Sequence, residues 1–106
     1  MLVATTNEIA GYRIVRHVGM VRGVIVRSRS VIGTIGASLQ SLLGGNISIF
    51  TTLAERTRQD AFALMVAQAE QIGANAVLAM RYDSVDMGTG ITEVLAYGTA
   101  VVVEPA

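Results

Sequence analysis

The segment from Ile91 to Val103 constrains this chain most, because it is apolar on both of the sides that an extended strand presents. Alternate residues of a strand point to opposite sides. One side carries Ile91, Glu93, Leu95, Tyr97, Thr99, Val101 and Val103, and the other carries Thr92, Val94, Ala96, Gly98, Ala100 and Val102. A long helix can cover one side. The second needs either a shorter helix of the same chain or a neighbouring copy of it.

Composition favours the neighbouring copy. The chain has 106 residues, which predicts one domain over residues 1–106. Of these residues 52% are hydrophobic and 15% are charged, against about 45–50% and about 25% in soluble domains. A domain this small leaves much of its surface in water. The excess of apolar side chains therefore predicts a homo-oligomer.

Four extended segments are expected. Residues 2–6 form a short one, and residues 12–29 form a long one that is rich in valine and isoleucine. Gly19 and Gly23 interrupt the long segment and indicate a bulge, a bend or a hairpin, so its path stays open. Residues 76–82 and 91–103 close the domain as two further strands.

Two helices are expected between these strands. Residues 31–43 change to helical spacing and end at Gly44-Gly45. A longer helix spans residues 48–72, with Gly73 at its C-terminal cap. Its predicted buried face is Phe50, Ala54, Thr57, Ala61, Leu64, Met65, Gln68 and Ile72. The order of elements predicts an α+β fold with two layers.

A membrane span is not expected. Residues 30–54 carry no charge, but polar residues and Gly44-Gly45 interrupt them, whereas a spanning helix needs about 20 mostly apolar residues. The first ten residues show no pattern of a signal peptide. We expect a cytoplasmic protein. A module that associates with membranes through residues 30–54 is a lower-ranked alternative.

Charge is divided between the two halves of the chain. Residues 1–54 carry five arginines and one glutamate, a net charge of +4, and residues 55–106 carry three arginines and seven acids, a net charge of −4. Arg22, Arg27 and Arg29 are candidate ligands for an anion. The favoured interpretation is that the basic and acidic halves pair within or between subunits. No nucleic-acid partner is expected, because such partners favour a basic excess over the whole domain.

Few residues are suited to a metal. The chain has no cysteine and one histidine, so one subunit cannot supply the four Cys or His ligands of a structural zinc site. His17 could be a ligand where copies meet. Asp83 and Asp86 could hold a hard cation, although a solvated turn is the simpler interpretation. Met65 and Met80 are expected in the core.

Several features, taken in order, resemble the YbjQ-like family of small bacterial proteins. They are Thr5-Thr6, Gly19 with Gly23, Gly44-Gly45, Ala61-Phe62, Gln68-Ala69, the run from Gly73 to Val77 and the run from Tyr97 to Val101. The resemblance implies an antiparallel sheet packed against one long helix plus a shorter helix, similar to a dodecin subunit. It further implies a homopentameric ring. The family carries the label "putative heavy-metal-binding" and offers no catalytic residues to transfer.

The sequence therefore supports two alternative hypotheses about the function. The first is a non-catalytic homo-oligomer, a pentamer by the resemblance, which binds a metal ion or a small ligand between subunits. The alternative is an enzyme with an intersubunit site for a small anionic substrate. In that case the anionic substrate would be bound by Arg22, Arg27 or Arg29, and the base would be His17 or Asp83. Neither interpretation identifies a cofactor.

Overall fold

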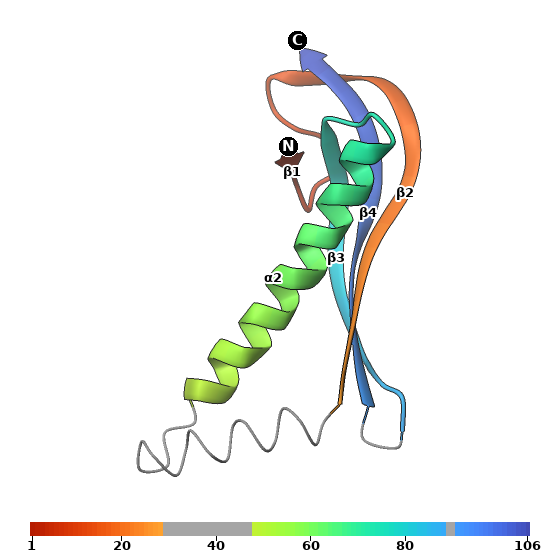
Figure 1. Cartoon of the computed structure of the whole chain (residues 1–106). Coiled ribbons are helices and arrows are strands. Elements are labelled where there is room, and N and C mark those ends of the chain that lie inside the picture. The colour runs from red at the N-terminus through yellow and green to blue at the C-terminus, as the bar shows by residue number, and fades with distance from the viewer. Residues whose placement is uncertain (29–47, 89–90) are drawn as a thin grey trace.

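The computed structural model describes residues 1–28, 48–88 and 91–106. The elements run in the order β1 (Leu2–Val3), β2 (Tyr12–Ser28), α2 (Ser48–Gln71), β3 (Ala76–Asp86) and β4 (Ile91–Pro105). Figure 1 shows α2 lying along one face of the sheet. The predicted α+β fold and its two layers are confirmed. The shorter helix expected over residues 31–43 lies outside the described residues.

The sheet is mixed, so the antiparallel sheet implied by the resemblance is wrong at one edge. Its strand order is β1-β3-β4-β2. β4 pairs antiparallel with both β2 and β3, whereas β1 pairs parallel with β3 through Leu2 and Val3. Parallel neighbours need a long connection between them, and here β2 and α2 both intervene along the chain.

The long segment whose path the sequence left open is one bent strand. β2 pairs with β4 continuously from Tyr12 opposite Pro105 to Ser28 opposite Ile91. Its register shifts twice, between Ile14 and Arg16 and between His17 and Gly19. Each shift places one extra residue in β2, which is the definition of a β-bulge.

The main core lies between α2 and the sheet. Its fully buried members include Val21 of β2, Ala61, Met65 and Ala69 of α2, Val77 of β3, and Ala96 and Ala100 of β4. Small residues dominate, so the helix backbone approaches the strands closely. At Gly23 a Cβ atom would collide with the carbonyl oxygen of Ala61 and would lie 2.6 Å from the backbone nitrogen of Met65.

The helix presents a narrower apolar face than its sequence predicts. Ala61 and Met65 are fully buried, but Leu64 and Ile72 remain 48% and 42% exposed. The side chain of Gln68 accepts a hydrogen bond from the backbone nitrogen of Arg22 at 2.7 Å. Phe62 and Val66 still pack against the main core, so the face is narrowed at Leu64 and Ile72.

The end of the helix follows its prediction. Gly73 takes a positive φ of 85°, and its nitrogen donates to the carbonyl of Glu70 at 3.1 Å. The nitrogen of Ala74 donates to the carbonyl of Ala69 at 3.0 Å. This pattern is a glycine cap, which satisfies the last carbonyl groups of the helix.

Within the described part of the chain, the face of the sheet away from α2 is covered at one end only. A second buried cluster there consists of Ala76, Leu78, Val101 and Val103, and Ala4 and Ile9 of the N-terminal segment pack against it.

The described residues include no helix with the length and apolar character that a membrane span requires.

Candidate functional site

The sheet face away from α2 organises most of the candidate residues, and we call it the outer face. Residues that pair across strands share a face. The register therefore places Met20, Arg22, Val24 and Val26 of β2, Arg81, Asp83 and Val85 of β3, and Ile91, Glu93, Leu95, Tyr97 and Thr99 of β4 on the outer face.

The predicted anion-binding arginines do not share a face. Arg22 pairs with Tyr97 and lies on the outer face, whereas Arg27 pairs with Thr92 and lies on the α2 side. Arg27 Nη2 binds Asp60 Oδ2 of the helix at 3.2 Å. Arg29 lies outside the described residues. One subunit thus separates Arg22 from Arg27 by the thickness of the sheet.

Basic and acidic halves of the chain do pair within the subunit. Arg13 binds Glu104 through both Nε and Nη2, and Arg27 binds Asp60. These side chains are 44–68% exposed, so each pair adds only about 0–1 kcal/mol to stability. Their role is to balance charge.

The candidate metal ligands are spread along the sheet. His17 pairs with Val101 and Asp83 pairs with Leu95, which places them about 20 Å apart along β4 at roughly 3.3 Å per residue. Asp86 lies further on, opposite Thr92, and its carboxylate accepts a hydrogen bond from the nitrogen of Gly88 at 3.1 Å. Within residues 1–28, 48–88 and 91–106, no three His, Asp or Glu side chains gather as a metal site. The described part of one subunit therefore offers no cluster of His, Asp or Glu ligands for a heavy metal.

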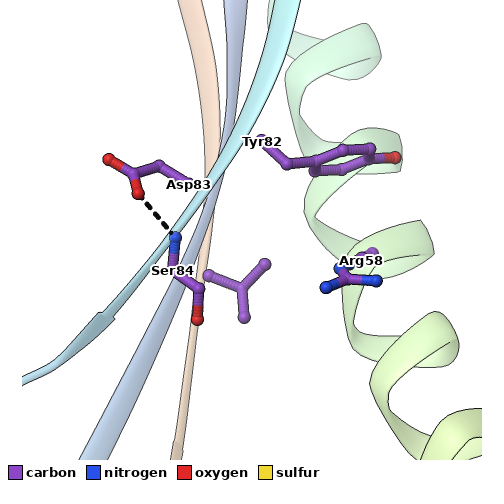
Figure 2. Close-up of a pocket in the computed structure, with 5 residues that line it drawn as sticks. Arg58, Tyr82, Asp83 and Ser84 are labelled. Atoms are coloured by element: carbon purple, nitrogen blue, oxygen red, sulfur yellow. Dashed lines mark hydrogen bonds between the residues drawn. The ribbon is translucent and has the colours of Figure 1, made fainter.

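A shallow hollow of about 150 Å³ opens between α2 and β3. Arg58, Tyr82, Ser84 and Val94 line it, together with Asp83. Figure 2 shows Tyr82 and Arg58 on the helix side of β3, while the carboxylate of Asp83 lies on the other side and binds the nitrogen of Ser84. Arg58 Nη1 also binds Glu55 Oε1 at 3.2 Å. Apart from Asp83, the members of this group were not candidates from the sequence, because they come from separate elements.

A larger hollow of about 280 Å³ lies beside the N-terminal segment, and we call it the outer hollow. It is lined by Asn7, Ile14, His17, Leu78, Ala79 and Thr99. Of these, only His17 was a candidate from the sequence. The others were missed because they are common residue types whose meeting depends on the strand register.

Comparison with known proteins gives one consistent family. The family described as "Putative heavy-metal-binding" matches residues 1–104. A UPF0145 protein of Solibacter usitatus is 59% identical over 98% of this chain and 93% of its own length. A UPF0145 protein of Burkholderia thailandensis is 55% identical over 94% of this chain and 90% of its own length.

A solved structure supports the fold. A protein of unknown function from Pediococcus pentosaceus, of the DUF74 family, superimposes with a TM-score of 0.56 over 98% of both chains. Its sequence identity to this chain is 16%, so the similarity concerns the fold alone.

Proposed function

The chain belongs to the family described as "Putative heavy-metal-binding", and from that premise we propose that it is a non-catalytic, homo-oligomeric binding protein. The family resemblance gives five as the number of copies. The observation that carries the proposal is the outer face of the sheet, where many side chains remain exposed and which the described residues cover at one end alone.

Several exposed side chains of the outer face are apolar, and they lie among the charged residues Arg22, Arg81, Asp83 and Glu93. Met20 is 70% exposed, Val26 is 53% exposed and Val85 is 46% exposed. Val24 and Ile91 are also exposed on the same face. Large apolar side chains exposed on one face of a small protein are typical of an interaction surface. A second copy is the partner that the two-sided β4 strand predicts.

In the sheet formed by the described strands, β2 and β3 provide two edges that could join neighbouring copies. β2 is an edge strand of 17 residues. At the opposite edge, β1 pairs with only Ala76 and Val77 of β3, so the described residues place no strand beside Tyr82–Val85. Free edges invite pairing with another chain. Two different edges that meet head to tail generate a ring when the rotation closes.

The shape of the subunit supports assembly as well. Its radius of gyration is 17.0 Å, whereas a compact domain of this length has a value of about 13 Å. In Figure 1, the N-terminal half of α2 diverges from the sheet, and most of its residues up to Asp60 are exposed. An elongated subunit buries less of its own surface and leaves more to share with a neighbour.

Assembly would also decide whether the family label applies. The described residues of one subunit do not gather a metal site, so a ligand set would have to combine side chains from several copies. His17, Asp83 and Asp86 are the candidates. The competing enzyme has less support, because Arg22 and Arg27 lie on opposite faces of the sheet. We also propose a cytoplasmic location.

Native mass spectrometry of untagged protein, purified without a chelator, tests the assembly. We expect five copies of the 11.2 kDa chain, which is five times 11.2, or 56 kDa. Val24→Arg, which places a charge on the outer face, should reduce the mass to that of smaller species. Ala67→Arg is the matched control, because Ala67 is exposed on α2 and arginine is a good helix former.

A monomeric wild-type protein would refute the proposal. So would a folded Val24→Arg variant that kept the full assembly mass. Circular dichroism of each variant confirms that it is folded. Val94, which lies on the α2 side of β4 and packs against the main core, is unsuitable for this test, because arginine there would disturb the subunit itself.

A further inference from the structure

The outer hollow is built by an irregularity of β2 that a regular strand would not have. Ile14 and His17 are three residues apart, so in a regular strand they would point to opposite faces. The first bulge adds Val15, since Ile14 pairs with Val103 and Arg16 pairs with Val102. The extra residue brings His17, opposite Val101, to the face that also carries Ile14. Bulges commonly re-aim a side chain in this way.

β3 is irregular at the same place. Its register shifts between Leu78 and Arg81, and Ala79 takes a φ of 52°. For a residue with a Cβ atom, this left-handed conformation costs about 1–2 kcal/mol. Strained backbone that the surrounding structure holds in place tends to cluster at functional sites. Here the strained residue lines the hollow directly.

The N-terminal segment forms a fixed wall. The nitrogen of Ala79 donates to the carbonyl of Thr6 at 2.9 Å, and the nitrogen of Met80 donates to the carbonyl of Ala4 at 3.0 Å. Arg81 Nη1 donates to the carbonyl of Thr5 at 2.7 Å. These three bonds hold the chain immediately before Asn7 against β3. The hollow is therefore preformed, as small-molecule sites usually are.

The lining residues indicate the chemistry of an occupant. Asn7, His17 and Thr99 offer hydrogen-bond donors and acceptors, while Ile14, Leu78 and Ala79 are apolar. None of the described lining residues is an acid, a lysine or an arginine. One imidazole beside an amide and a hydroxyl is a poor ligand set for a soft metal. A volume of about 280 Å³ is close to the lower limit of roughly 300 Å³ for ligand sites.

We propose that the outer hollow binds an uncharged small organic molecule, with one ring or a short apolar body and one polar edge, whose polar edge meets His17, Thr99 and Asn7. This inference rests on the proposed binding function and names its site, but it does not depend on the number of subunits. It assigns the only histidine of the chain to an organic ligand instead of a heavy metal.

The single histidine makes the test direct. Protein labelled with ¹³C-histidine gives one imidazole signal, since the chain has one His. Benzamide is the probe, and benzoate is its charged counterpart of nearly equal shape. We expect a saturable shift of the His17 signal with benzamide and much weaker binding of benzoate. Thr99→Val removes one hydroxyl at constant shape and should weaken benzamide about threefold to tenfold.

Thr51→Val is the matched control, because Thr51 is exposed on α2; it should bind benzamide as the wild type does. Three results would overturn the inference: no saturable shift with benzamide, benzoate bound as tightly as benzamide, or a Thr99→Val variant with unchanged affinity. A fourth result would also overturn it: saturable binding of Zn²⁺ at His17 that is tighter than the binding of benzamide would assign His17 to the metal. The native mass is measured on the same samples. A monomer that binds benzamide refutes only the assembly, and an intact assembly that does not bind it refutes only this site.

Discussion

Replacement of Gly23 by alanine tests the contact that positions α2 on the sheet. A Cβ atom at this position would collide with the carbonyl oxygen of Ala61, and it would lie 2.6 Å from the nitrogen of Met65 and 2.8 Å from the Cβ of Leu64. Optimal contacts between non-bonded heavy atoms are about 3.5–4.0 Å. The helix would have to withdraw by about 1 Å.

The loss of stability on Gly23→Ala depends on the contacts between α2 and β2 that this withdrawal would break. Two of the three nearest atoms belong to the helix backbone, which cannot rotate away as a side chain can. Gaps of about 0.5–1 Å remove a quarter to a half of each dispersion contact, and Val21, Ala61 and Met65 are fully buried beside this point. Overpacking usually costs about 1–3 kcal/mol. We expect Gly23→Ala to lower the free energy of unfolding by about 3 kcal/mol, the upper end of that range.

Urea unfolding followed by circular dichroism measures this change, at one protein concentration for all variants because assembly contributes to stability. Gly11→Ala is the control. Gly11 has a positive φ of 82° but no atom within 4 Å of an added Cβ, so alanine there should cost only about 1–2 kcal/mol of backbone strain. If Gly23→Ala destabilised the protein no more than Gly11→Ala does, the close approach of α2 to β2 would be refuted.

Two further predictions concern the strained bulge and the end of the sheet. Ala79→Gly should raise the urea midpoint. Glycine removes about 1–2 kcal/mol of strain from the left-handed conformation, and the greater chain entropy of glycine in the unfolded state costs only about 0.5–1 kcal/mol. A lower midpoint would refute the strain at Ala79. Asn75→Ala should lower the free energy of unfolding by about 1–3 kcal/mol, because the amide of Asn75 donates to the carbonyl of Val103 at 2.9 Å and accepts from its nitrogen at 2.8 Å. An unchanged unfolding midpoint would show that these two bonds are replaced by water without loss.

The apolar character of the outer face could be predicted in part from the sequence. Alternation along β4 predicted two apolar sides, and among the described residues one side carries the main core and the other carries exposed apolar side chains. The prediction omitted one contributor, because the N-terminal segment covers Val101 and Val103. A chain of 106 residues thus supplies a partial second cover of its own, from a segment whose position depends on parallel pairing between β1 and β3.

Regular alternation failed where the strands are irregular. Regular alternation would put Leu78, Met80 and Tyr82 on one side of β3. Instead, Leu78 belongs to the second buried cluster, on the outer face, and Met80 belongs to the main core, while Tyr82 is 45% exposed. The register shift at Ala79 separates Leu78 from Met80. An alanine in a sequence does not indicate a left-handed conformation. The placement of Leu78 and Met80 on opposite faces of the sheet could therefore not be predicted.

The sequence by itself determined the elements that depend on local periodicity and on glycine chemistry. They are the long helix ending at Gly73, the strands before and after the last turn, and the apolar character of both sides of β4. Only the tertiary structure decided the parallel edge strand, the bulges of β2 and β3, and the meeting of Asn7, His17 and Thr99. The physical reason is that periodicity follows from bonds between near neighbours in the chain, whereas strand register is fixed by pairing between residues that lie far apart in sequence.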